Sequence, residues 1–191
     1  MKNNLKWIIY SLLILPHIIC FYCSAHRSVI EKDIERWKHF RPHLKDTKIL
    51  YALMYLLIFE ASFRNQFYLR MGNVRIILKI LLHEVPCSVI ETRNIGEGFV
   101  FMHGMGTSVN SLSRIGCNCT LYHNVLIGVG NDLKQAPIIG DNVTIGYGAI
   151  IIGNVRIGNN VKIGAGTVVT HDIPDKTTVV GPKPRLICHT Q

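Results

Sequence analysis

Two histidines have the residue type and the spacing that acid–base chemistry requires. His103 is the third residue of a six-residue unit that begins at Phe101, and His123 is the third residue of the unit that begins at Leu121. Imidazole takes up and releases protons near neutral pH, so a stacked pair of this kind suits general base catalysis. We therefore interpret His103 and His123 as the candidate catalytic residues, with both side chains pointing outward.

The six-residue units belong to a repeat in the second half of the chain. The recurring aliphatic positions are Ile139, Ile145, Ile151, Ile157, Ile163 and Val169. Glycine follows the aliphatic residue in four of these six units. Neither a helix nor an alternating strand has a period of six. The repeat predicts a parallel β-helix, with three units in each triangular coil and the aliphatic side chains inside.

The repeat continues upstream with two irregularities. Its register runs back through Ile127, Leu121, Ile115, Phe101 and Ile95. Phe101 and Ile115 are 14 residues apart, two more than two units, which predicts a bulge at residues 104–106. Residues 130–135 have the composition of a loop. Once the bulge is allowed for, one coil separates the two histidines, and they are expected to stack near one corner about 4.8 Å apart in coil height.

The first half of the chain has a different composition. The 191 residues carry a net charge of +9, and 14 basic against 7 acidic residues place +7 of it before residue 95. Residues 28–40 align their apolar side chains on one stripe, which predicts an amphipathic helix. Residues 47–82 also have a helical pattern. We expect an α-helical region over residues 27–88, a β-helix over 89–175 and a tail over 176–191.

Residues 1–26 form an apolar N-terminal segment. After Lys2 and Lys6, the 17 positions from residue 7 to residue 23 contain no charged residue, which is at the short end of what spans a bilayer. Pro16 and the flanking aromatic and basic residues favour an interfacial position. Our hypothesis is attachment at the inner face of the membrane, peripherally or as an anchor. The alternative is a helix buried against another subunit.

The cysteines and basic residues exclude several classes of protein. Six cysteines at irregular spacing do not form a disulfide framework, which favours a reducing, cytoplasmic compartment. Cys20 and Cys23 form a CxxC without a second pair or a histidine at zinc-binding distance, so no metal site is expected. The basic residues are not interleaved with exposed aromatic residues on the glycine-rich part, so no nucleic-acid partner is expected.

The chain resembles the left-handed β-helix acyltransferases. The resemblance rests on the repeat and on the segments FMHGMG, LYHNVLIG and GPKPRLI, and it runs from about residue 29 to residue 187. The chain is similar to the serine acetyltransferase branch and, within it, to the O-acetyltransferases of surface-polysaccharide and colanic acid biosynthesis. The resemblance implies an all-β left-handed parallel β-helix preceded by an α-helical N-terminal region, a homotrimer, and acetyl-CoA as the acyl donor.

The resemblance also implies roles for individual residues. His103 matches the general base that takes the proton of the acceptor hydroxyl, and His123 matches a histidine of the polysaccharide branch. CoA is expected in the groove between neighbouring subunits, with the GPKPR segment near its phosphates. The residues expected to contact CoA are Tyr147, Gly148, Ala165, Lys183 and Arg185.

The acceptor site departs from that of the serine acetyltransferases. They carry an acid directly before the catalytic histidine, where this chain has Met102, and another at the position of Ser88. They also carry an Arg-His pair where this chain has Gln135 and Ala136. Without that pair, the carboxylate of serine has no evident cationic partner, so serine is expected to be a poor substrate.

The sequence therefore predicts acetyl-CoA-dependent O-acetylation of a sugar or glycan hydroxyl in surface-polysaccharide biosynthesis. The acceptor is expected to be a small-molecule or lipid-linked sugar, bound by Asn124, Asn131 and Gln135. The alternative is a serine O-acetyltransferase of cysteine biosynthesis. A β-helix that only drives oligomerisation is a third reading, which His103 and the GPKPR segment argue against.

Overall fold

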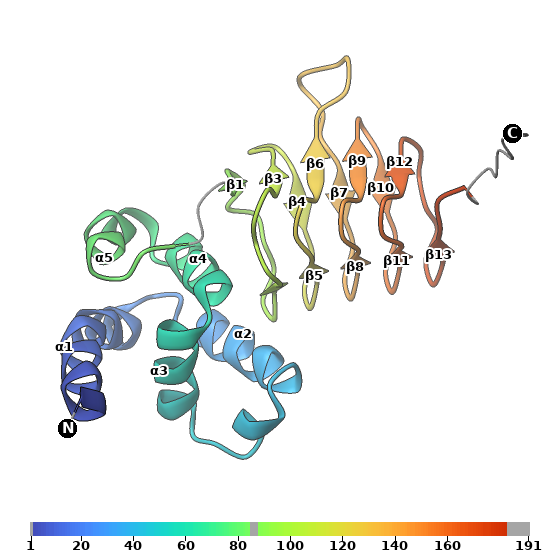
Figure 1. Ribbon diagram of the computed structural model, residues 1–191. Helices are drawn as coiled ribbons and strands as arrows, with labels where there is room; N and C mark the ends of the chain where they lie inside the picture. The colour runs from blue at the N-terminus through green and yellow to red at the C-terminus, as the bar shows by residue number, and fades with distance from the viewer. Residues whose placement is uncertain (1, 85–87, 183–191) are drawn as a thin grey trace, which may run out of the picture.

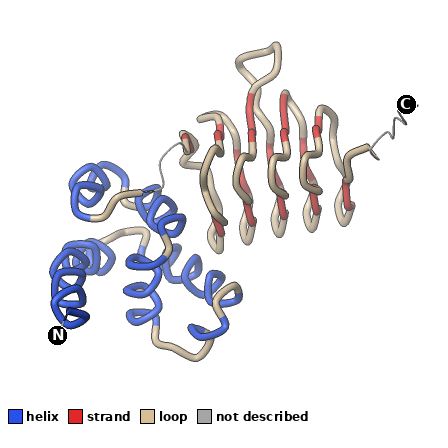
Figure 2. The backbone as a smooth tube through the Cα atoms, in the orientation of Figure 1, coloured by secondary structure: helices blue, strands red, loops and turns tan. Residues whose placement is uncertain are grey.

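A helical region is followed by a coiled stack of short strands (Figure 1). The computed structural model describes residues 2–84 and 88–182. The helices are α1 (Lys2–Cys23), α2 (Arg27–His39), η1 (Pro42–Leu44), α3 (Ile49–Phe59), α4 (Ala61–Arg70), η2 (Gly72–Val74) and α5 (Arg75–Leu81). The strands are β1 (Val89–Ile90), β2 (Val100–Phe101), β3 (Ser108–Val109), β4 (Arg114–Ile115), β5 (Thr120–Leu121), β6 (Leu126–Gly128), β7 (Ile138–Ile139), β8 (Thr144–Ile145), β9 (Ile150–Ile152), β10 (Arg156–Ile157), β11 (Lys162–Ile163), β12 (Val168–Val169) and β13 (Thr178–Val179). Figure 2 shows the two kinds of structure as separate regions.

The strands build three parallel sheets that form the faces of a β-helix. We call them sheet A (β1-β3-β6-β9-β12), sheet B (β4-β7-β10) and sheet C (β2-β5-β8-β11-β13). The aliphatic residue of each unit is buried in one continuous core. Asparagine takes the left-handed backbone at several corners, with φ between 56° and 58° at Asn118, Asn124, Asn142 and Asn160. This architecture confirms the predicted fold class, a left-handed β-helix preceded by helices.

The amphipathic helix predicted over residues 28–40 is α2. Ile30, Ile34 and Trp37 are buried in a second core formed by the helices. Val100 and Met102 of the first coil also belong to this core. Because both regions contribute to one apolar cluster, the helices are seated on the end of the β-helix.

A buried ion pair joins the helices to the first coil. Asp33 on α2 accepts hydrogen bonds from Arg70 on α4, with Nε to Oδ2 at 3.0 Å, and from the Phe99 backbone N–H at 2.9 Å. The Arg70 guanidinium also donates to the backbone oxygens of Ile95 and Gly96, both at 2.6 Å. Burial raises the pKa of the Asp33 carboxyl, and the Arg70 charge and these hydrogen bonds oppose that rise.

Helix α1 packs against the other helices along one face. Its buried side chains are Ile14, His17 and Phe21. His17 Nε2 lies 3.0 Å from Tyr68 Oη on α4, and that hydroxyl donates to the Leu82 carbonyl oxygen at 2.6 Å. Burial lowers the pKa of His17 and raises that of Tyr68, so both groups stay neutral at pH 7. Within the described residues, no helix is both long and apolar enough to cross a membrane.

Breaking the buried ion pair should destabilise the fold strongly. We expect Asp33→Ala to lower the free energy of unfolding by about 3–5 kcal/mol, because the Arg70 charge then stays buried without its partner. Glu97→Ala is the matched control, since it removes the exposed Lys32–Glu97 pair, which is worth about 0–1 kcal/mol. Urea unfolding of both variants measures the difference. Similar small losses in the two variants would contradict this account of the junction.

Candidate active site

His103 lies on a strained corner between sheets C and A. The turn from β2 to β3 contains the predicted bulge, and His103 takes a left-handed backbone with φ of 58°. A residue with a side chain adopts this conformation at a cost, which is common at functional sites. Gly104 is the next residue. A Cβ added to it would lie 2.5 Å from the Phe101 ring, so the turn needs glycine at this position. The result is an exposed imidazole on a tightly specified backbone.

His123 lies next to His103 on the same corner, one coil further along. The two ring centroids are 5.9 Å apart and the rings are nearly perpendicular, at 88°. On its other side, His123 packs on the Tyr147 ring with centroids 4.4 Å apart. His123 is half-buried, and its Nδ1 is buried without a hydrogen-bond partner among the described residues. The structure therefore brings the two sequence-predicted histidines together, with His103 the more exposed.

The residues expected to contact CoA continue this corner. Tyr147 and Ala165 occupy the third position of the units begun by Ile145 and Ile163, as the histidines do in theirs. The Gly148 N–H donates to the His123 carbonyl oxygen at 3.1 Å, which stacks the two corners. The ring contact between His123 and Tyr147 did not enter the sequence prediction, although the shared third position was the signal that could have revealed it. Lys183 and Arg185 lie outside the described residues.

Asn124 is part of the same corner. It has φ of 56°, and its side-chain amide donates to Tyr147 Oη at 3.3 Å. An added Cβ at Gly106 would lie 2.0 Å from Asn124 Oδ1, so the bulge closes directly onto this side chain. Of the residues proposed to contact an acceptor, Asn124 is the one that the structure places beside the histidines.

Asn131 and Gln135 lie at a different corner of the same chain. They belong to the loop that leaves the stack between β6 of sheet A and β7 of sheet B (Figure 1). Asp132 organises this loop, because its carboxylate accepts from the Lys134 backbone N–H at 3.0 Å and from Gln135 Nε2 at 2.9 Å. Asn131, Lys134 and Gln135 are exposed. One chain alone does not bring this loop to the His103 corner.

The imidazole of His103 makes no hydrogen bond to any residue in the described part of the chain. Met102, directly before it, is 7% exposed and packs with the helices. Ser88 accepts a hydrogen bond from Asn65 Nδ2 at 2.8 Å instead of facing the histidine. Residues 2–84 and 88–182 also contain no group of three or more side chains that could hold a metal ion. The described site is thus a histidine pair flanked by an aromatic ring and backbone amides, which suits proton transfer to and from a bound hydroxyl.

The chain is similar to known transferases. The family model "Bacterial transferase hexapeptide (six repeats)" matches residues 136–171. The serine acetyltransferase of Bacillus subtilis (strain 168) is 34% identical over 140 residues, which are 72% of this chain and 63% of that protein. The structure of serine acetyltransferase isoform 3 from Entamoeba histolytica, in complex with cysteine, has a TM-score of 0.64 and 26% identity and covers 86% of this chain and 61% of that one. The soybean serine acetyltransferase apoenzyme has a TM-score of 0.60 and 30% identity over 84% of this chain and 68% of that one. This chain spans less than two thirds of the length of the Bacillus and Entamoeba proteins.

These comparisons overturn the expected acceptor. Sugar or glycan O-acetylation, with a small-molecule or lipid-linked sugar as partner, is wrong, because the relatives found by both sequence and structure are serine acetyltransferases. The error came from the missing Arg-His pair at Gln135 and Ala136. That loop lies at another corner than His103 of the same chain, so its composition alone does not show how the carboxylate of an acceptor is bound.

Proposed function

The chain belongs to the hexapeptide-repeat transferase family, and on this premise we propose that it transfers an acetyl group from acetyl-CoA to the hydroxyl of L-serine. The observation that carries the proposal is the exposed His103 imidazole, held on a strained corner and packed edge-on against His123. The serine acetyltransferase relatives support the choice of serine.

In the proposed reaction, His103 acts as the general base. Its neutral imidazole takes the proton of the serine hydroxyl while the oxygen attacks the thioester carbonyl of acetyl-CoA. The C–S bond then breaks, and the imidazolium returns the proton to the departing CoA thiolate. The products are O-acetylserine and CoA, and His103 is again neutral.

His123 and Tyr147 serve as positioning residues in this proposal. The His123 ring packs edge-on against His103 and rests on Tyr147, which restricts the motion of the His103 ring. Precise placement of a catalytic group lowers the activation free energy considerably, so this packing aids proton transfer. We assign the CoA groove to the same corner, along Tyr147, Gly148 and Ala165, with Lys183 and Arg185 contacting phosphates.

Serine needs partners for its charged groups as well as for its hydroxyl. Asn124 offers an amide beside the histidines, and its contact with Tyr147 holds it there. Asn131 and Gln135 add amides from the protruding loop of a neighbouring subunit, and the exposed Lys134 adds the positive charge that a carboxylate prefers. In this proposal, other donors replace the Arg-His pair, and the carboxylate of serine is still bound.

The outer face of sheet A supports assembly as a homotrimer. Its outward positions are aligned by the strand register and are apolar in four of five strands: Val89, Ser108, Leu126, Ile150 and Val168. Val89 and Val168 are 54% and 58% exposed in the single chain, which is unusual for valine. The matching row of sheet C carries Thr144, Lys162 and Thr178. Because sheet A begins at the His103 corner, subunits joined there would share the site.

We also propose that the enzyme works in the cytoplasm, where acetyl-CoA is made, and rests peripherally on the inner face of the membrane. Leu12, Leu15, Ile19 and Tyr22 form an exposed apolar stripe on α1, opposite the face that packs on the helices. Because α1 is apolar on both faces, its outer face also needs an apolar surface to cover it. The basic excess of this half of the chain suits anionic lipids.

Replacing His103 should lower turnover strongly without disturbing the corner. His103→Asn keeps a residue that tolerates φ near 58°, as Asn124 and Asn142 do here, but it removes the base. We expect kcat with L-serine to fall by about 10²–10⁴-fold with CoA affinity unchanged, measured by thiol release. His171→Asn, an exposed histidine of the last coil, is the control and should retain full activity. Full activity of the His103→Asn variant would show that another residue is the general base.

A charge in the apolar row of sheet A should break the trimer. Leu126→Glu places a carboxylate among apolar neighbours of the proposed interface, whereas Thr144→Glu places it on the polar row of sheet C. Light scattering should give a trimer for the wild type and Thr144→Glu, and smaller species with little activity for Leu126→Glu. A fully active wild-type monomer would refute the shared site.

Polar substitutions on the outer stripe of α1 should release the enzyme from membranes. In Leu12→Gln/Leu15→Gln/Ile19→Gln the buried face of α1 is intact, so the fold and the acetyl transfer are expected to persist. Cell fractionation should then find the variant in the supernatant and the wild type with the membranes. The control Leu50→Gln/Tyr51→Gln changes exposed residues of α3 and should stay with the membranes. Identical fractionation of all three proteins would make α1 a packing element only.

A further inference from the structure

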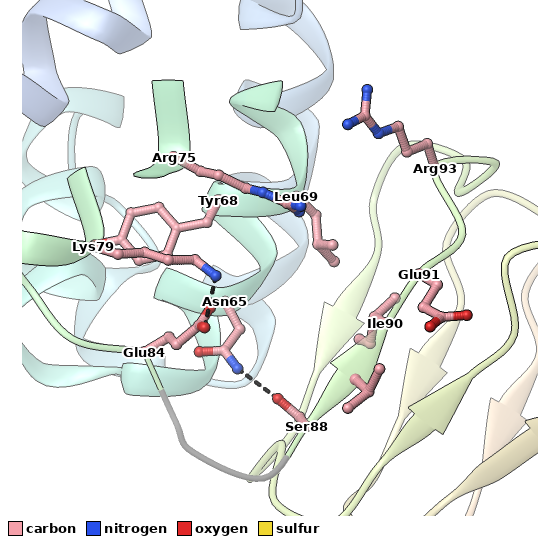
Figure 3. Close-up of a pocket in the computed structure, with 11 residues that line it drawn as sticks. Asn65, Tyr68, Leu69, Arg75, Lys79, Glu84, Ser88, Ile90, Glu91 and Arg93 are labelled. Carbon is pink, nitrogen blue, oxygen red and sulfur yellow. Dashed lines mark hydrogen bonds and ion pairs between the residues drawn. The ribbon is translucent and has the colours of Figure 1, made fainter. Parts of the chain in front are cut away.

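A cavity of about 380 Å³ lies between the helices and the first coil, and the proposed acetyl transfer does not use it. Figure 3 shows its two walls, one from α4 and α5 and the other from the segment around β1. None of the residues that line it belongs to the His103 corner, residues 103–106. Its volume is at the lower end of the range for small-molecule sites.

The charged groups of this cavity are unevenly paired. Lys79 binds Glu84 at 2.6 Å, so these two charges compensate each other. Arg75 on the helical wall and Arg93 on the coil wall make no hydrogen bond or ion pair with any described residue. Both guanidinium groups extend into the gap between the walls, while the Glu91 side chain points away from them (Figure 3). Arg75, Lys79 and Arg93 against Glu84 and Glu91 leave the lining with an excess of one positive charge, and the two unpaired arginines come from two different parts of the fold.

Two guanidinium groups in one gap repel each other unless an anion lies between them. Arginine is suited to this task, because its planar group binds two oxygens of a phosphate or carboxylate at once. A phosphate group carries about −1.5 to −2 charges at pH 7 and so balances two arginines, whereas one carboxylate balances only one. Apart from Glu91 and the Lys79–Glu84 pair, the rest of the lining is neutral or apolar and includes Leu69, Ile90 and the Asn65–Ser88 hydrogen bond.

We propose that this cavity binds the phosphate group of a small phosphorylated molecule, held between Arg75 and Arg93. Such a ligand connects α5 to the first coil at a point other than the Asp33–Arg70 junction. It therefore stabilises the arrangement of the helices on the coil that carries His103, from a position outside the acetyl-transfer site.

Calorimetric titration of the full-length protein with inorganic phosphate tests the proposal, and variants of the two arginines distinguish this cavity from the donor groove. The wild type should bind phosphate, and Arg75→Gln and Arg93→Gln should each raise the Kd at least about tenfold, since each removes charge-assisted hydrogen bonds. Arg156→Gln is the control: it makes the same change at an exposed position on β10, away from the cavity, and should bind as the wild type does. Phosphate should also raise the melting temperature of the wild type but not of Arg75→Gln/Arg93→Gln.

Each contrary outcome overturns the assignment. Absence of phosphate binding by the wild type, equal affinity in the double variant, or an equal loss in Arg156→Gln would each refute a site built by these two arginines. Malonate, a dicarboxylate of similar charge, serves as the second probe, and binding as tight as that of phosphate would refute the choice of phosphate. Dissociation of the double variant into smaller species would assign the arginines to a contact between copies of the chain. Because binding is measured without acetyl transfer, these results are independent of whether serine is the acceptor.

Discussion

Hydrogen bonds between successive coils are the constraint on which the site depends. Each strand of the β-helix pairs in parallel with the strand one coil away, and corner amides pair in the same way, as the Gly148 N–H does with the His123 carbonyl. This ladder leaves little freedom in the height or rotation of a corner. Residues at the same position of successive coils therefore lie above one another, which places His103, His123 and Tyr147 in ring contact although they are far apart in sequence.

The helices add a second constraint at the end of the stack. The first coil has no earlier coil to pair with, and the helices cover its apolar side chains Val100 and Met102. Asp33 and Arg70 bind the backbone at Phe99, Ile95 and Gly96 in place of a preceding strand. His103 follows this segment directly, so its corner is held by the next coil on one side and by the helices on the other.

The features of the fold that repeat, or that depend on residues close together in the chain, could be predicted from the sequence. A period of six predicts the β-helix, its inward aliphatic residues and the corner shared by the two histidines, and the 14-residue spacing locates the bulge beside His103. Contacts between residues far apart in the chain carry no such pattern. Asp33 with Arg70, and His17 with Tyr68, each join two helices across dozens of residues, and nothing in their spacing indicates the pair. The acceptor was predicted wrongly for a related reason, since residues 135 and 136 lie away from His103 of their own chain and do not by themselves show which groups bind a carboxylate.

A competition between acceptors shows whether this histidine corner acetylates serine, as we propose. The enzyme and acetyl-CoA are incubated with equal concentrations of L-serine and a panel of free sugars, and the acetylated products are identified by mass spectrometry. O-acetyl-L-serine should be the dominant product, and the sugars should remain unmodified. An acetylated sugar formed while serine is left intact would refute serine acetylation at this corner.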